Sequence, residues 1–324
     1  MPRRHPAIGE RELGPLMIDL EGLALSAAEA QLLRHRAVGG VILFSRNYQH
    51  PGQVRSLVAA IRSAAGRPVL VAIDQEGGRV QRMRSGFSAL PPARILGEVH
   101  DSDPGRALEM ARARGRLLAL ELDAVGIDFS FAPVVDVDHG RSDVIGDRAL
   151  HGDPEVVSIL GSALVRGAAS AGMACVAKHF PGHGWVAADS HVEMPVDERD
   201  YSALLADLLP FERLFAAGAR AVMTAHVQYP AVDDPTPCYS SRWMREELRR
   251  RMGFSGAIFA DDLSMHGAGQ AGDLGQRVEA ALEAGCDMLP ICNDPKGVRE
   301  LLKDWRYADR PNSAARLARL RRAA

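Results

Sequence analysis

The chain has 324 residues, of which 47% are hydrophobic and 25% are charged, and its 39 basic and 41 acidic residues give a net charge of −2. This composition can supply both a sizeable core and an ordinary solvated surface. The near balance of charge gives no reason to expect a nucleic-acid or anionic-membrane partner. The length suits a (β/α)8 barrel, which needs roughly 250 residues or more.

The cysteines and the N-terminal sequence bear on the cellular compartment. No CxxC spacing occurs, so we expect free thiols in a reducing environment. The basic N-terminus lacks the apolar run of about 7–15 residues that a signal peptide needs. No uncharged stretch approaches the ~20 residues of a membrane span. We therefore expect a soluble cytoplasmic protein without a membrane partner. The cysteines are Cys175, Cys238, Cys286 and Cys292.

Short apolar runs rich in β-branched residues recur along the chain, and each is followed by an amphipathic stretch. Such near-continuous apolar strands are typical of parallel sheets that are buried on both faces. There are eight of them, the number that a closed barrel requires. The runs are Leu16–Leu20, Gly40–Phe44, Val69–Ile73, Phe129–Val137, Cys175–His179, Ala221–His226, Ala257–Asp261 and Met288–Cys292.

The intervening stretches carry helical signals. Apolar residues after Pro51 follow the spacing of one buried helical face. Asp103-Pro104 and Asp153-Pro154 each place a capping carboxylate before a proline suited to a first helical turn. Tyr201–Ala217 and Asp273–Ala284 predict later crossover helices. We find no repeat or linker, and no GxGxxG after the first strand to favour a doubly wound open sheet. The sequence predicts an α/β fold, with one (β/α)8 TIM-type barrel domain over residues 1–324.

Polar residues collect where the predicted strands end, which is the catalytic face of such barrels. Unpaired charges at these positions are costly unless a polar ligand arrives there, so we expect a pocket for a polar small molecule. The residues are Asp74, Glu76, Arg79, Asp136, Asp138, Arg148, Lys178, His179, His226, Asp261 and Asp262.

The segment after the fifth strand runs from Pro181 to about Arg199, and loops of this length are usually functional. Within it, Asp189 precedes His191 by two residues. An aspartate can accept from one ring nitrogen and raise the basicity of the other, so the two predict a general acid/base near neutral pH. For His183 we expect a loop-stabilising hydrogen bond.

Asp261 is a candidate nucleophile because a carboxylate at a strand end is rigidly held. Retaining glycosidases ordinarily use two carboxyl groups ~5 Å apart. A histidine in place of the second carboxyl would not repel an anionic acceptor, so phosphorolysis stays open beside hydrolysis. Strand alternation does not choose between Asp261 and Asp262, although we expect Asp262 to be a helix cap or structural partner. Asp136 and Asp138 either bind ligand or only bond backbone amides. His226 either holds the nucleophile or is a satisfied core histidine.

Several motifs in order resemble the family-three glycoside hydrolases, and most of all the single-domain bacterial β-N-acetylglucosaminidases of the NagZ type. The likeness covers nearly the whole chain. The motifs are DQEGGRVQR at 74–82, IGDRA at 145–149, KHFPGHG at 178–184, DSH at 189–191 and FADDLSM at 259–265.

This resemblance implies a retaining β-N-acetylhexosaminidase. We separately expect a monomer that needs no cofactor or metal. Its substrate would be a small glycoside or muropeptide, N-acetylglucosaminyl-1,6-anhydro-N-acetylmuramic acid with or without peptide, released in cell-wall recycling. The motifs imply that Asp261 is the nucleophile, His191 the acid/base and Asp189 its dyad partner. The implied sugar-binding residues are Asp74, Arg82, Arg148, Lys178 and His179.

Trp185 and His266 depart from the family pattern, and we expect them to alter the aglycone side. Two other classes compete with the glycosidase hypothesis. His179, His183, His191, His226 and Asp261 are enough ligands for a zinc-dependent barrel hydrolase. A catalytically silent sugar-binding protein is the other.

Overall fold

The computed structural model describes residues 13–188, 194–306, 308 and 310–322. Eight strands within these residues correspond one to one with the eight predicted apolar runs. They are β1 (Leu16–Ile18), β2 (Val38–Leu43), β3 (Leu70–Ile73), β6 (Phe129–Ser130), β7 (Val176–Phe180), β8 (Ala221–Thr224), β9 (Ala257–Phe259) and β10 (Leu289–Ile291).

All the ladders between these strands are parallel, and they form two sheets, β10-β1-β2-β3-β6 and β7-β8-β9. Single parallel bridges join the sheets at both edges, from Val134 to Lys178 and from Phe259 to Met288. The ring of strands is thereby closed. The strand of β6 is shorter than the predicted run because Pro133 has no N–H to donate to the ladder.

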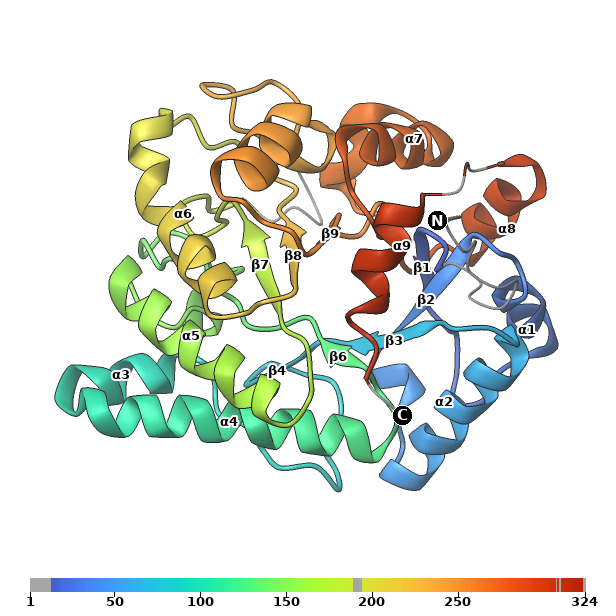
Figure 1. Ribbon diagram of the computed structural model, residues 1–324, viewed down its shortest axis with the longest axis horizontal. Coiled ribbons are helices and arrows are strands. Elements are labelled where there is room, and N and C mark those ends of the chain that lie inside the picture. Colours follow the sequence, from blue (N-terminus) through green and yellow to red (C-terminus); the bar gives the residue numbers. More distant parts are fainter. Residues whose placement is uncertain (1–12, 189–193, 307, 309, 323–324) are drawn as a thin grey trace, which may run out of the picture.

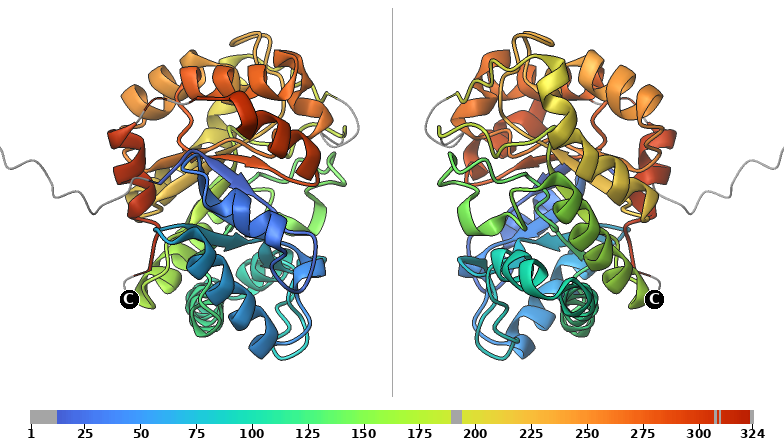
Figure 2. Two further views of the ribbon diagram at one scale, coloured as in Figure 1. Left: turned by 90° about the vertical axis from the view of Figure 1, so that its right-hand side faces the viewer. Right: turned by 90° about the vertical axis from the view of Figure 1, so that its left-hand side faces the viewer.

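Helices surround the strands, as Figures 1 and 2 show. The predicted Asp-Pro caps are confirmed, since Asp103 accepts from Arg106 N and Asp153 from Glu155 N. The helices are α1 (Ala27–Leu33), α2 (Pro51–Ala65), α3 (Arg94–Ser102), α4 (Pro104–Ala124), α5 (Pro154–Ser170), α6 (Tyr201–Ala216), α7 (Leu274–Ala284), α8 (Pro295–Asp304) and α9 (Pro311–Ala318). None of the helices in the described ranges has both the length and the apolar character needed to cross a membrane.

Shorter elements decorate the barrel. An antiparallel hairpin, which the sequence did not predict, follows β3. It consists of β4 (Gln75–Gly77) and β5 (Val80–Gln81). The other short elements are 3-10 turns at Ser45–Asn47, Gly146–Arg148, Pro237–Tyr239 and His266–Ala271, and a π-helix at Arg242–Arg251.

Three phenylalanines fill the barrel interior beneath the polar strand ends. Phe129, Phe131 and Phe259 contact one another edge to face, with ring centroids 5.4–5.8 Å apart. All three are fully buried. This arrangement is favourable for aromatic rings and gives the carboxyl end of the barrel a rigid apolar floor.

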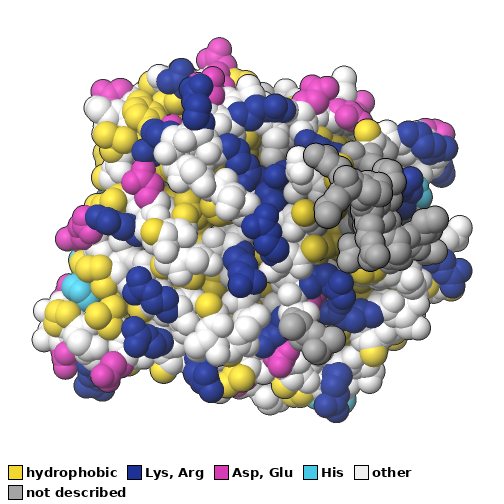
Figure 3. Space-filling model, in the orientation of Figure 1, with side chains coloured by type: hydrophobic (Ala, Val, Ile, Leu, Met, Phe, Trp, Pro, Cys, Tyr) yellow, Lys and Arg dark blue, Asp and Glu magenta, His cyan; other side chains and the backbone are white. Residues whose placement is uncertain are grey.

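Helix α9 covers the opposite end of the barrel, where the strands begin. Its Arg316 pairs with Asp287, which directly precedes the last strand region, and Arg220 donates to the carbonyl oxygen of Arg319 just after the helix. Figure 3 shows Lys and Arg side chains gathered beside α9 on this face. The basic side chains that close this end therefore lie across the barrel from the predicted site.

Candidate active site

A cavity of about 660 Å³ opens at the carboxyl ends of the strands. Its walls come from segments that follow β2, β3, β6, β9 and β10 and from β7 itself. Six of the predicted site residues line it: Asp74, Arg82, Arg148, Lys178, His179 and Asp261. Asp189 and His191, the predicted acid/base pair, lie outside the described residues.

Lys178 and Arg148 are held by two carboxylates. Lys178 Nζ lies 2.7 Å from Asp74 Oδ1 and 2.7 Å from Glu76 Oε1. Arg148 donates to both oxygens of Glu76, at 2.8 and 2.9 Å. The paired geometry satisfies both fork nitrogens of the guanidinium, so the wall of the cavity is charged and also rigid.

Burial and charge pairing shift the pKa values of Glu76 and Lys178 in opposite directions. Burial would raise the pKa of Glu76, but Lys178 and Arg148 outweigh it and hold that pKa well below its ordinary value. Burial would lower the pKa of Lys178, but Asp74 and Glu76 raise it above the ordinary value. Both groups are therefore charged at neutral pH.

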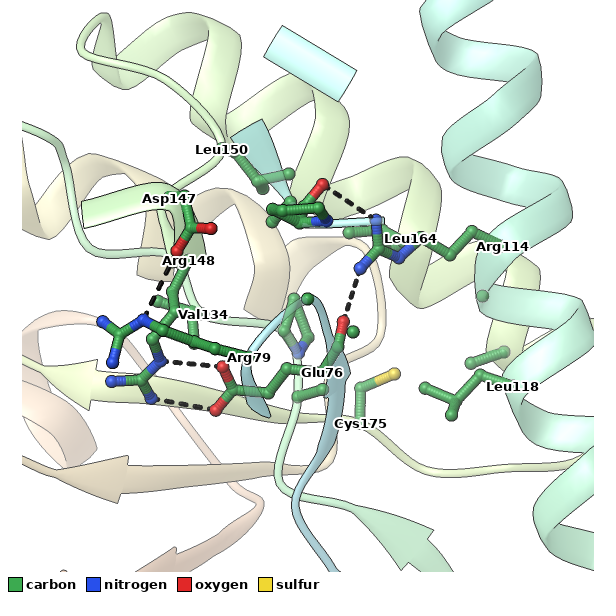
Figure 4. A pocket seen from close by; sticks show the side chains of 18 of the residues that line it. Glu76, Arg79, Arg114, Leu118, Val134, Asp147, Arg148, Leu150, Leu164 and Cys175 are labelled. Carbon is green, nitrogen blue, oxygen red and sulfur yellow. Dashed lines mark hydrogen bonds and ion pairs between the residues drawn. The ribbon is translucent and has the colours of Figure 1, made fainter. Parts of the chain in front are cut away.

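Glu76 separates the cavity from a second, much smaller hollow, which Figure 4 shows. Its carboxylate faces Arg148, while its carbonyl oxygen accepts from Arg114, which reaches in from α4. The hollow beyond has a volume of about 40 Å³ and mostly apolar walls. Since a water molecule takes about 30 Å³ in the liquid, this hollow is too small for a sugar.

Arg82 is the least constrained cation of the site. Its Nη2 lies 3.7 Å from Asp74 Oδ2, and its guanidinium lies 5.7 Å from the ring centre of Phe44. Its buried Nε has no hydrogen-bond partner in the structure described. A buried donor of this kind is costly unless a ligand oxygen reaches it.

Asp136 orients two histidines of the KHFPGHG motif. Its Oδ1 accepts the backbone N–H groups of His179 and His183, at 3.1 and 2.8 Å, and its Oδ2 lies 2.7 Å from His179 Nδ1. A carboxylate only accepts here, so His179 carries hydrogen on Nδ1 and presents Nε2 for ligand. Asp136 thus bonds backbone amides and also fixes a ring that lines the cavity.

His183 corrects an expectation. We expected its ring to stabilise the loop, but neither ring nitrogen has a hydrogen-bond partner among the described residues, although both are buried. The ring lines the cavity, and only the backbone N–H fixes the loop. An unpartnered buried ring at a cavity wall fits contact with a ligand hydroxyl better than a structural role.

The two adjacent aspartates after β9 have different surroundings. The Asp262 carboxylate accepts from Ser264 N, Ser264 Oγ and Cys292 N at 2.8–2.9 Å, which confirms the expected structural role. Asp261 Oδ1 accepts only a backbone N–H, that of Asp262, at 2.8 Å in the described structure.

The pKa values of the two aspartates move in opposite directions. Burial would raise the pKa of Asp261, but His226, His179, the Asp262 N–H and Lys178 together bring it below the ordinary value. Burial raises the pKa of Asp262. Both carboxylates line the cavity, and Asp261 is the one whose pKa is lowered and whose oxygens are less engaged by the protein.

Trp185 lies at the base of the loop that follows β7. Its ring is sandwiched between Arg141 and Arg199, whose Cζ atoms lie 4.3 and 4.5 Å from the ring centre. Arg199 is fixed in turn by Asp197 and Asp207. Trp185 thus ties the two ends of the loop together. The other departure from the family pattern, His266, is exposed beside Met265, which lines the cavity.

The described residues contain no group of three or more His, Cys, Asp or Glu side chains that could hold a metal ion. Of the five zinc ligands considered from the sequence, His191 lies outside this part of the chain. The described part of the site consists of an accessible carboxylate, paired cations and histidines around the cavity, which suits a neutral polyhydroxyl ligand.

We predict that Glu76→Gln lowers the free energy of unfolding by about 3–5 kcal/mol at pH 7, because it leaves Arg148 without its carboxylate partner and Lys178 paired with Asp74 alone. The pKa of Glu76 is lower in the folded state, so its stabilisation is present above the unfolded pKa of about 4.3 and is lost as pH falls. The difference in free energy of unfolding between wild type and Glu76→Gln, measured by urea unfolding, should become smaller from pH 7 to pH 3.5. Glu98→Gln, at an exposed position, is the control. A gap that is constant with pH would contradict the assigned charge state.

Comparisons with known proteins agree with this geometry. The model of the "Glycosyl hydrolase family 3 N terminal domain" matches residues 11–320. Proteins named beta-hexosaminidase are similar over 95% of the chain. The one from Methylobacillus flagellatus is 49% identical over 88% of its own length, and the one from Alkalilimnicola ehrlichii is 52% identical over 88% of its length.

Solved structures extend the likeness to the fold. NagZ from Neisseria gonorrhoeae in complex with N-trifluoroacetyl-D-glucosamine superposes with a TM-score of 0.92 at 42% identity, over 98% of this chain and 92% of that one. A beta-N-acetylhexosaminidase from Beutenbergia cavernae superposes with a TM-score of 0.82 at 27% identity, over 98% and 97% of the two chains. The chain therefore belongs to glycosyl hydrolase family 3 and is a glycoside hydrolase of the β-hexosaminidase type.

Proposed function

We propose that the chain removes terminal, non-reducing β-linked N-acetylglucosamine with retention of configuration, through a covalent glycosyl intermediate on Asp261. The observation that carries this proposal is the state of Asp261. It is a partly exposed, ionised carboxylate at a strand end, oriented by one backbone N–H and lining the cavity. A nucleophile needs an available oxygen, whereas both oxygens of the neighbouring Asp262 already accept hydrogen bonds.

The sugar is bound by Asp74, Arg82, Arg148, Lys178 and His179. Carboxylate oxygens accept from sugar hydroxyls, while guanidinium and ammonium groups donate to hydroxyls and to the acetamido oxygen. Because these cations are already paired with Asp74 and Glu76, they do not need an anionic ligand. The N-acetylglucosamine analogue in the similar Neisseria protein supports this sugar class.

The reaction follows two displacements. In the first, His191 protonates the leaving oxygen while Asp261 attacks the anomeric carbon. In the second, His191 takes a proton from water, and the water oxygen displaces Asp261 from the sugar. Asp189 orients the His191 ring. The assignments of His191 and Asp189 rest on the DSH motif.

The substrate we propose is a peptidoglycan fragment, N-acetylglucosaminyl-1,6-anhydro-N-acetylmuramic acid with or without its peptide, in cell-wall recycling. The resemblance to NagZ supports this choice, as does a cavity of about 660 Å³, which leaves room beyond one sugar ring. The cytoplasmic location and the monomeric state expected from the sequence remain predictions.

We predict that a 5-fluoro N-acetylglucosaminyl fluoride forms a stable ester with Asp261, because the ring fluorine slows both displacements while the fluoride leaving group keeps the first one fast enough for the ester to accumulate. Tandem mass spectrometry of the labelled peptide must place the sugar on Asp261 and not on Asp262. Asp261→Asn should lower kcat by at least about 10³-fold. A label on any other residue would refute the assignment.

We also predict the pH dependence of hydrolysis. Since the pKa of Asp261 is lowered, the nucleophile stays ionised at pH 5, and an imidazole general acid should make kcat/KM fall as pH rises through about 6.5. His191→Ala should remove this alkaline limb, and it should slow an alkyl glycoside far more than the 4-nitrophenyl glycoside, whose leaving group needs little protonation. An unchanged alkaline limb in the variant would exclude His191. Assays with and without phosphate distinguish hydrolysis from phosphorolysis.

A further inference from the structure

His226 lies one strand away from the nucleophile, just after β8, and it is fully buried. Its Nε2 lies 3.0 Å from the carbonyl oxygen of Asp262. A carbonyl oxygen can only accept a hydrogen bond, so Nε2 carries the hydrogen. In a neutral imidazole the other nitrogen, Nδ1, is then an acceptor that needs a donor.

That donor is a thiol. Cys238, in the turn Pro237–Tyr239, is fully buried and places Sγ 3.7 Å from His226 Nδ1. Burial raises the pKa of the Cys238 thiol to about 12, so the S–H is retained at neutral pH. Thr236 Oγ1 lies 3.7 Å from the same sulfur and limits how the thiol can turn. The thiol therefore favours one tautomer of His226.

Asp262 connects this pair to the nucleophile. Its carbonyl oxygen accepts from His226, and its carboxylate is fixed by Ser264 and Cys292. With the residue held at these points, its own N–H is directed at Asp261 Oδ1. Neither His226 nor Cys238 is among the described residues that line the cavity. Their effect on the position of the nucleophile therefore passes through Asp262, in addition to the lowering of the Asp261 pKa by His226.

We propose that Cys238 and His226 are positioning residues for the nucleophile. The thiol fixes the tautomer of His226, and the Nε2–H of His226 fixes the Asp262 backbone. The Asp262 N–H then engages Asp261 Oδ1, which leaves Oδ2 as the oxygen that attacks the anomeric carbon. This inference rests on the proposed role of Asp261. It adds two residues outside the cavity to the machinery of the reaction.

The test separates nucleophile placement from sugar binding. The variants are His226→Phe, which keeps a ring without hydrogen bonds, Cys238→Ala, which removes the donor to Nδ1, and Cys238→Ser, which restores one. Cys175→Ala, at another buried cysteine, is the matched control. We measure the rate constant for labelling of Asp261 by the fluoro-sugar and the Kd of N-acetylglucosamine. Nitrogen-15 NMR of the imidazole gives the tautomer of His226.

We expect His226 of the wild-type protein to carry its hydrogen on Nε2 and none on Nδ1. Because small displacements of a reacting group cost up to about 100-fold in rate, labelling should slow by about 10- to 100-fold in His226→Phe, with Kd unchanged. Cys238→Ala should slow labelling less than His226→Phe does, and His226 should then populate both tautomers. Cys238→Ser should restore the labelling rate and the single tautomer. If His226→Phe does not fold, the Cys238 variants decide the question.

Two results overturn the inference, and they differ from failure of the proposed function. In the first, Asp261 is labelled in the wild-type protein, and the folded variants have labelling rate constants within about twofold of the wild-type value, whereas misplacement of the nucleophile would cost up to about 100-fold. In the second, wild-type His226 is protonated at Nδ1. If wild type is labelled elsewhere than Asp261, the proposed function fails and this inference fails with it.

Discussion

The structure depends on the pairing of buried charges at the carboxyl end of the barrel. Asp74, Glu76, Lys178 and Arg148 come from distant parts of the chain and meet between β3 and β7. Each would be unfavourable alone in this partly buried wall, and each is tolerated because a group of opposite charge lies beside it. The resulting wall is polar enough to bind a sugar and nearly neutral in charge.

Rigidity of the same kind extends to the reacting groups. The carboxylate of Asp136 fixes the His179 ring, and the backbone N–H of Asp262 fixes the Asp261 carboxylate, so each group is held by a neighbour. The loop after β7 is tied at its base by Trp185 and Arg199. The nucleophile is therefore held by the barrel, whereas the proposed acid/base depends on the loop.

The barrel could be predicted from the sequence because buried parallel strands leave apolar runs and Asp-Pro caps mark helix starts. Five site residues were predicted because strand ends meet on one face, and Arg82 was implied by the family resemblance. Glu76 was placed at the same strand end, but its part in holding Lys178 and Arg148 was not predicted. The structural role of Asp262 was expected, but its contact with Cys292 N joins residues that are distant in sequence, and the placement of the His183 ring at the cavity leaves no pattern in the sequence. The hydrophobic pattern of a sequence does not predict which ring nitrogen of a histidine has a hydrogen-bond partner.

The central claim is that Asp261 acts as a covalent nucleophile, and the anomer released first tests it most directly. Proton NMR of the hydrolysis of a β-N-acetylglucosaminide, recorded before mutarotation, shows which anomer forms. Two displacements predict β-N-acetylglucosamine as the first product. If the α-anomer forms first, water attacks the sugar directly, and Asp261 is not the nucleophile.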